Sequence, residues 1–149
     1  MNIIKLLAIN NLTISTVESM TGGALAASLV QKKGASKVFL GGQVVYSNEA
    51  KSIFLQKSIE EINNIGSVSQ DMSQILALQL TKQYKSNISC GITGYASNSK
   101  FNSIAFITII YNGKIVNSQV KFAKRSRQAI IKKTIKQTIK SIKKIIKLY

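Results

Sequence analysis

A chain of 149 residues, 45% of them hydrophobic, is long and apolar enough to form one domain with a buried core, which excludes a disordered protein. Twenty-one Lys and Arg against five Asp and Glu give a net charge of +16, which suits an acidic partner but also fits the residue bias of an A/T-rich genome. The absence of histidine and the single cysteine, Cys90, exclude a histidine base, a cysteine-cluster metal site and an internal disulfide.

The N-terminal stretch MNIIKLLAINN predicts an amphipathic first helix rather than a signal peptide, because it lacks a small-residue cleavage site. No apolar run approaches the roughly 18 residues that a membrane-spanning helix needs. We therefore expect a cytoplasmic protein without a membrane partner.

Predicted strands and helices alternate along the first half of the chain. Gly34 is typical of the residue that ends a helix, and Gly41-Gly42 indicates a bulge or a close backbone approach within a strand. Ser47 or Asn48 is suited to cap the helix that follows. The predicted elements are a helix at 1–10, a strand at 11–17, a helix at 24–33, a strand at 38–47 and a helix at 48–56.

The second half contains the clearest local signals. Ser69 is a plausible N-cap of a helix that reaches residue 84, with Asp71 in its first turn, and residues 87–94 predict a buried strand. Residues 103–122 predict two strands around Asn112-Gly113, which favours a type I′ hairpin. The last helix starts near Ser126, and its predicted apolar face consists of Ile131, Ile135, Ile139, Ile142 and Ile146.

Strands separated by helices, with one late hairpin, predict an α/β domain with a mixed sheet and no second domain. Ligands of open α/β sheets bind beyond the carboxyl ends of the strands. Three predicted strands end in hydroxyl-rich or glycine-rich turns, and we expect these turns to converge on one rim. They are TVESMTGG, VVYSNEAK and CGITGYAS.

Each of these turns allows a chemical and a simpler interpretation. SMTGG can cradle an anion, or it is an ordinary turn with Ser19 or Thr21 as a helix cap. Lys51 can activate a serine hydroxyl if burial lowers its pKa, or it is one more surface lysine. The Thr93 hydroxyl and the Gly94 N–H can bind an oxyanion or a phosphate, or they are small residues chosen for packing. Cys90 is interpreted as a buried apolar residue rather than a nucleophile.

The lysine-rich C-terminal helix also has two interpretations. It can bind a membrane, a nucleic acid or a partner protein, or it packs on the sheet and leaves its lysines in water, which is the interpretation we favour. It lacks Trp and Phe, which are typical of membrane-surface helices, and no basic groove with interleaved aromatic residues is visible.

In order along the chain, TVESMTGGALAASLV, GASKVFLGGQVVYSNEAK, GSVSQDMSQILA and ISCGITG resemble the C-terminal domain family of competence-damage-inducible protein A, CinA. That domain also exists alone as the bacterial nicotinamide-nucleotide amidase. The resemblance implies that residues 1–149 form one three-layer α/β/α domain with a mixed, mostly parallel sheet. It further implies a homo-oligomer, with a dimer favoured, and hydrolysis of nicotinamide mononucleotide to nicotinate mononucleotide and ammonia, without a metal or cofactor, in pyridine nucleotide recycling.

The resemblance also assigns roles to matching residues. Ser19 would be the nucleophile or would position one, Lys51 the base, and Tyr46 a hydroxyl relay or orienting group. Glu18 would either hold Lys51 charged or fix the serine turn. The residues that would bind substrate are Thr21, Gly22, Gly23, Asn48, Thr93 and Gly94, together with Glu18.

Two stretches depart from the family pattern. After Gly94 the family continues with a small residue, Ala-Gly-Pro and further glycines, whereas this chain reads YASNSKFNS. Near the last helix the family has F-x-G-x-R, whose arginine is suited to bind a phosphate. Here the corresponding stretch is KFAKRSRQ, and the sequence does not decide whether Arg125 or Arg127 matches that arginine. The alternative is therefore a catalytically impaired nucleotide-binding or interaction protein, with association to nucleic acid supported by charge alone.

Overall fold

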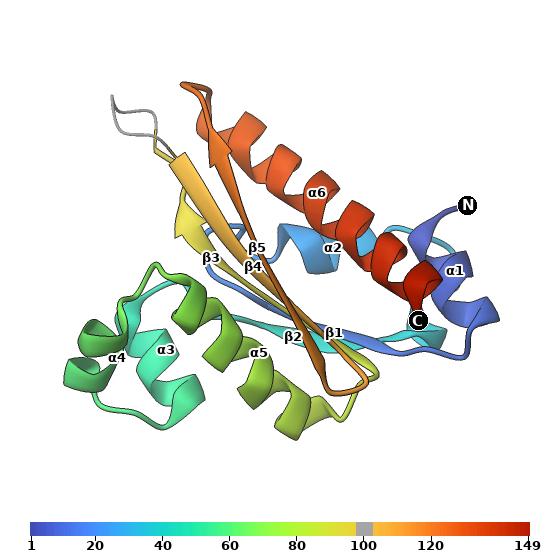
Figure 1. Ribbon diagram of the computed structural model, residues 1–149, viewed down its shortest axis with the longest axis horizontal. Coiled ribbons are helices and arrows are strands. Elements are labelled where there is room, and N and C mark those ends of the chain that lie inside the picture. Colours follow the sequence, from blue (N-terminus) through green and yellow to red (C-terminus); the bar gives the residue numbers. More distant parts are fainter. Residues whose placement is uncertain (98–102) are drawn as a thin grey trace.

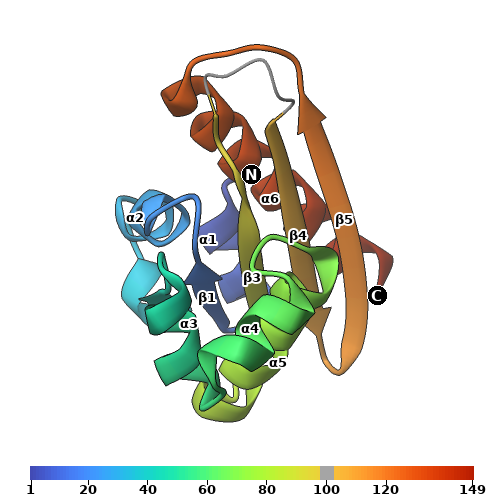
Figure 2. The ribbon, with the colours of Figure 1, turned by 90° about the vertical axis from the view of Figure 1, so that its left-hand side faces the viewer.

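A computed structural model describes residues 1–97 and 103–149, in which helices cover both faces of one five-stranded sheet (Figure 1). The helices α1, α2 and α6 lie on one face, and α3, α4 and α5 lie on the other (Figures 1 and 2). The elements are α1 (Ile3–Ile9), β1 (Ile14–Glu18), α2 (Ala24–Val30), the 3₁₀ helix η1 (Ala35–Lys37), β2 (Phe39–Val44), α3 (Asn48–Leu55), α4 (Ile59–Ile65), α5 (Gln70–Tyr84), β3 (Ile88–Tyr95), β4 (Ser103–Tyr111), β5 (Lys114–Phe122) and α6 (Arg127–Leu148).

The sheet has the strand order β2-β1-β3-β4-β5. The interior strand β1 runs parallel to β2 and β3, whereas β4 is antiparallel to both β3 and β5. The α/β/α layers, the mixed sheet and the late hairpin are thus confirmed. The sheet is not mostly parallel, because the hairpin strands β4 and β5 contribute two antiparallel pairings beside the two parallel ones. Asn112 and Gly113 both have positive φ angles, 47° and 82°, as the predicted hairpin turn requires.

Each face of the sheet has its own hydrophobic cluster. Ile14 of β1 packs in the cluster formed with α1, α2 and α6, whereas Val17 packs in the cluster formed with α3, α4 and α5. All five residues of β1 are buried, because the strand has neighbours on both edges and helices on both faces. This interior strand carries the candidate site at its carboxyl end.

Two expectations about the elements need correction, and one is confirmed. The helix α4 was not predicted, although Ser58 and Glu61 form a capping box at its start, a local signal for a helix. Gly34 does not end α2, which stops at Val30, and instead precedes η1. The predicted bulge is present, since the register shifts between Ile14 and Ser15 where β1 pairs with β2.

The buried face of α6 agrees with the predicted one at Ile142 and Ile146 but differs from it earlier in the helix. The fully buried residues include Ile130, Thr134 and Thr138, whereas Ile131, Ile135 and Ile139 are half-buried at the margin of the core. Threonine fits this face because the hydroxyls of Thr134 and Thr138 donate to carbonyl oxygens one turn earlier, at 2.9 and 2.8 Å. A pattern based on apolar residues alone therefore found Ile142 and Ile146 but missed the two threonines that share the buried face.

Among the helices of residues 1–97 and 103–149, which include the 22-residue α6, none combines the length and apolar character that crossing a membrane demands.

Candidate active site

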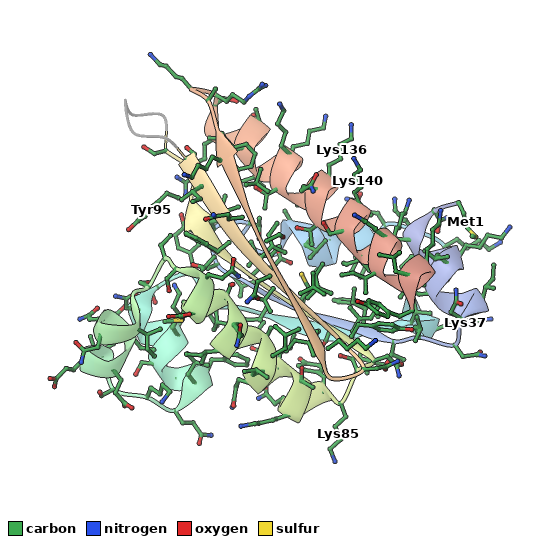
Figure 3. All side chains as sticks on the ribbon, in the orientation of Figure 1. Met1, Lys37, Lys85, Tyr95, Lys136 and Lys140 are labelled. Carbon is green, nitrogen blue, oxygen red and sulfur yellow. The ribbon has the colours of Figure 1, made fainter. Side chains whose placement is uncertain are left out.

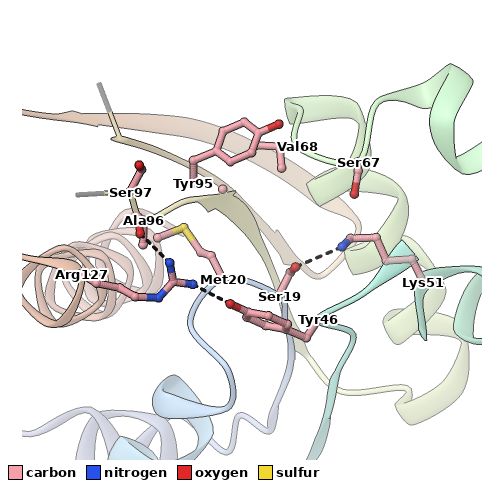
Figure 4. A pocket seen from close by; sticks show the side chains of 11 residues that line it. Ser19, Met20, Tyr46, Lys51, Ser67, Val68, Tyr95, Ala96, Ser97 and Arg127 are labelled. Carbon is pink, nitrogen blue, oxygen red and sulfur yellow. Dashed lines mark hydrogen bonds between the residues drawn. The ribbon is translucent and has the colours of Figure 1, made fainter. Parts of the chain in front are cut away.

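A pocket of about 380 Å³ lies beyond the carboxyl ends of β1 and β3 (Figure 4). This is the place where open α/β sheets bind ligands. Three backbone turns meet there: the residues after β1, those between β2 and α3, and those after β3. The lining residues are Ser19, Met20, Tyr46, Lys51, Ser67, Val68, Gly94, Tyr95, Ala96, Ser97 and Arg127.

Ser19 and Lys51 form a direct pair in this pocket. Lys51 Nζ donates a hydrogen bond to Ser19 Oγ over 3.1 Å (Figure 4). Only 6% of Ser19 and 2% of Lys51 is exposed, although the two residues are 32 positions apart in sequence. Lys51 reaches the serine from α3, which starts after the Ser47 cap, while the Ser19 N–H donates to the Ile92 carbonyl at 2.9 Å and fixes the turn against β3.

Burial lowers the pKa of Lys51, because a charged ammonium loses hydration inside the protein. Among the described residues, the one ion pair joins Lys57 to Glu61 at the surface, so Lys51 has no carboxylate partner that would restore its charge. A lysine in this state is suited to accept a proton from the hydroxyl that it contacts.

Glu18 stabilises the turn that follows β1, which is one of its two predicted roles. Its buried carboxylate accepts hydrogen bonds from Thr21 Oγ1 at 2.6 Å and from the N–H groups of Leu25 and Ala26 at 3.0 and 2.8 Å. These bonds satisfy amide groups at the start of α2, which have no partners within the helix. The idea that Glu18 holds Lys51 charged is wrong, since the carboxylate faces α2 and Lys51 contacts Ser19.

Thr21, Gly22 and Gly23 build the same turn but do not line the pocket. The hydroxyl of Thr21 is used by Glu18, and the two glycines have φ angles of 59° and 93°, in the left-handed region that favours glycine. Their sequence pattern therefore reflects the turn that presents Ser19, and the prediction that they contact a ligand finds no support in the pocket lining.

Tyr46 and Arg127 face each other across the pocket (Figure 4). Arg127 Nη2 donates to the Tyr46 hydroxyl, and Nη1 donates to the Ala96 carbonyl at 2.7 Å. Tyr46 is 59% exposed and does not contact Ser19 or Lys51 through any hydrogen bond in the described part of the chain. The structure distinguishes the two candidate arginines: Arg127 lines this pocket, and Arg125 lines a separate groove.

Of the remaining predicted residues, Gly94 lines the pocket, whereas Thr93 and Asn48 form hydrogen bonds behind it. A Cβ at Gly94 would lie 2.2 Å from Met20 Sδ and 2.3 Å from the backbone oxygen of Ile104, so a larger residue would collide with the backbone of β4. Thr93 is fully buried and donates to the Ser67 carbonyl at 3.0 Å, which leaves its hydroxyl behind the wall. Asn48 likewise donates to Asn63 and accepts from Ser67.

Sequence reasoning missed several wall residues. Met20, Ser67, Val68, Tyr95, Ala96 and Ser97 also line the pocket. Ser67 and Val68 lie in the GSVS segment between α4 and α5, which was read only as part of a family motif. The predicted change in the loop after Gly94 falls partly on residues 98–102, outside the described residues.

Cys90 is fully buried in β3, as expected for an apolar role. Its burial, and secondarily the charge of Glu18, raise the pKa of the thiol above its usual range, so the sulfur is held as an unreactive thiol.

Fold and site together define an α/β domain with a preformed serine–lysine pair at the carboxyl ends of its parallel strands. The profile of the CinA C-terminal domain family matches residues 1–146, and the chain belongs to this family.

Relatives of known sequence and structure agree with this assignment. A CinA-like protein from Flavobacterium psychrophilum is 34% identical over 97% of this chain, and one from Prochlorococcus marinus is 40% identical over 80% of it. The chain spans 36% and 29% of the lengths of these two proteins. The crystal structure of a competence/damage-inducible protein from Agrobacterium tumefaciens is 25% identical, with a TM-score of 0.86 over 94% of this chain and 88% of the other. A CinA superfamily protein from Klebsiella pneumoniae shares the fold, with a TM-score of 0.89 at 21% identity, over 99% of this chain and 94% of the other.

Proposed function

We propose that this domain is an amidohydrolase that converts nicotinamide mononucleotide and water to nicotinate mononucleotide and ammonia. The observation that carries the proposal is the buried contact of 3.1 Å between Lys51 Nζ and Ser19 Oγ, in a pocket that a small ligand can enter. Ser–Lys pairs are an established substitute for histidine-based triads, and this chain has no histidine. The choice of nicotinamide mononucleotide as the substrate rests on the family resemblance and on the arginine in the pocket wall.

The chemistry requires Lys51 to be neutral when the substrate is bound. Its amine takes the proton of Ser19 as Oγ attacks the carboxamide carbon. The C–N bond then breaks, and the ammonium of Lys51 returns the proton so that ammonia leaves. In the second half, Lys51 deprotonates a water that attacks the acyl-serine ester, and its ammonium returns this proton to Ser19 Oγ as the ester C–O bond breaks. The acid product loses its own proton to solvent and leaves as the carboxylate.

Arg127 is the proposed phosphate anchor. A guanidinium carries five N–H donors, more than the two bonds to Tyr46 and Ala96 use, and its planar fork matches a phosphate. Its bond to the Tyr46 hydroxyl would couple the orientation of the tyrosine ring to phosphate binding. Tyr46 would then orient the substrate, while the proton transfer itself belongs to Lys51.

Ammonia release from nicotinamide mononucleotide by the purified chain tests the proposal. We expect multiple turnovers, and we expect Ser19→Ala to abolish them while Ser28→Ala, on the outside of the site, leaves them unchanged. A wild-type protein that is folded but releases no ammonia, beside an active enzyme of the family, would contradict the proposal.

A second candidate is a domain that binds a pyridine nucleotide without turning it over. The observation that favours it is the pocket wall after Gly94, where Tyr95, Ala96 and Ser97 replace the small and glycine-rich residues of the family pattern. This candidate predicts that nicotinamide mononucleotide raises the melting temperature while no ammonia forms. The homodimer implied by the resemblance remains a prediction, and light scattering of the purified chain measures it.

A further inference from the structure

Positive charge is concentrated in the second half of the chain. Residues 1–74 contain six Lys and Arg and five Asp and Glu, whereas residues 75–149 contain fifteen Lys and Arg and no acidic residue. A codon bias that acts on the whole chain would spread lysines over both halves. Such asymmetry between halves is instead typical of a surface that meets an acidic partner.

The structure gathers much of this charge along α6. One groove of about 340 Å³ lies between the end of β5 and α6, and a second of about 1020 Å³ follows α6 itself. The two grooves share Lys136, Gln137 and Lys140, so they form one continuous surface, and these two lysines project away from the sheet (Figure 3). We call this surface the basic face, and its cations are Lys121, Arg125, Lys132, Lys133, Lys136, Lys140, Lys143, Lys144 and Lys147.

The charges of the basic face are not neutralised within the described residues. The one ion pair there joins Lys57, between α3 and α4, to Glu61 of α4, and α6 has no acidic residue in its sequence. Lys133, Lys136 and Lys140 follow one another at helical spacings of three and four, where like charges repel. A bound polyanion would relieve this repulsion along a helix of roughly 33 Å.

We propose that the basic face binds the phosphodiester backbone of a nucleic acid duplex without reading its sequence. Charge complementarity to closely spaced phosphates is the main argument. Single-strand binding is disfavoured because Phe122, the one aromatic residue that lines either groove, is only 6% exposed and offers no stacking surface.

Other occupants fit the basic face less well. A second copy of the chain would bring like charges together. A lipid surface would need a broad exposed apolar side of α6, but Ile130, Ile142 and Ile145 of that helix are buried against the protein core. Ile135 and Ile139 line the larger groove, but both are half-buried and lie between lysines. The proposal does not depend on the amidohydrolase activity, because the residues of the basic face do not line the Ser19 pocket.

The test is fluorescence anisotropy with a labelled duplex of about 30 base pairs of scrambled sequence, between about 50 and 200 mM salt. We expect saturable binding that weakens steeply with salt. The triple variant Lys133→Gln/Lys136→Gln/Lys140→Gln is expected to make the slope of log affinity against log salt shallower by about 2.7, since each phosphate contact contributes about 0.9. The matched control Lys33→Gln/Lys37→Gln/Lys82→Gln removes three exposed lysines that line neither groove, and it is expected to keep the wild-type slope.

Further measurements separate a loss of duplex binding from a loss of folding in the variants. Thermal melts establish that the variants are folded, and Lys133→Arg/Lys136→Arg/Lys140→Arg is expected to retain binding because it preserves the charge. The proposal is overturned if the wild type does not bind the duplex at about 50 mM salt. It is also overturned if the control triple weakens binding as much as the groove triple, or if phosphatidylserine vesicles or a single strand of equal length bind more tightly than the duplex.

Discussion

The pocket and the basic face use the same side chain in opposite surroundings. In the pocket, Lys51 is 2% exposed, and its nitrogen contacts a serine hydroxyl. On α6, Lys136 and Lys140 point into water and have no acidic neighbour on their helix. Desolvation makes the first a candidate base, whereas hydration keeps the others as fixed positive charges. The burial of a lysine, rather than its presence, therefore separates the two regions.

The largest expected effect comes from exchanging one lysine of each kind for methionine. Lys51→Met is expected to lower kcat for amide hydrolysis by about 10³-fold, because it removes the base that contacts Ser19. Lys136→Met removes an exposed lysine and is expected to leave kcat unchanged. Steady-state kinetics of ammonia release measure both, and equal kcat values for the two variants would remove Lys51 from the chemistry.

The same contrast applies to the acidic residues Glu18 and Glu49. Glu18→Gln is expected to lower the free energy of unfolding by about 1–3 kcal/mol, since an amide places a donor against the N–H groups of Leu25 and Ala26. Glu49→Gln, on the exposed first turn of α3, is expected to change it little. Urea unfolding of both variants measures the difference. A stable Glu18→Gln protein would mean that the charge of this carboxylate does not hold the turn.

The two arginines give a smaller and more specific comparison. Arg127→Gln is expected to raise KM for the nucleotide about tenfold with a modest change in kcat, because a charge-assisted phosphate contact is lost. Arg125→Gln removes an equal charge from the basic face and is expected to leave KM unchanged. An equal rise in KM for both would indicate that the pocket responds to overall charge rather than to the guanidinium in its wall.

The smallest expected effect is a pH dependence of stability. The pKa of Lys51 is lowered in the folded protein relative to an unfolded value of about 10.4, so the unfolded chain binds more protons between the two values. Wild-type stability should therefore rise with pH through that window, whereas Lys51→Met lacks this gain. As pH approaches about 10.4, the melting temperature of the wild type should therefore rise relative to that of Lys51→Met. With Lys136→Met the difference should not vary, and a constant difference for Lys51→Met would refute the lowered pKa.

Local signals in the sequence predicted much of the fold. Ser47 and Ser69 cap α3 and α5, and Asn112-Gly113 turns the hairpin, because caps and tight turns depend on the few residues beside them. Placing strand ends on one rim, together with the family resemblance, anticipated that Ser19 and Lys51 lie close together. That contact spans 32 positions, and it follows from parallel strands whose carboxyl ends share an edge.

Features that depend on tertiary packing were not predictable in this way. Thr93 and Thr21 were read as ligand groups, but their hydroxyls are used by the Ser67 carbonyl and the Glu18 carboxylate. Ser67 itself reaches the pocket from the segment before α5, and no local pattern indicates that approach. Sequence shows that a hydroxyl is available, whereas its partner is fixed by how the elements pack.

The buried thiol of Cys90 can be used to measure how often the sheet opens beside the pocket. Cys90 lies at the middle of β3, opposite Thr16 of β1 and Ile109 of β4, with no exposed surface. A thiol reagent can modify it only when β3 separates from one of these neighbours. Because it is the chain's single cysteine, the labelling rate reports the opening of the strand that leads into the pocket. A nucleotide that binds the closed form should slow this labelling in proportion to its occupancy, without any engineered reporter.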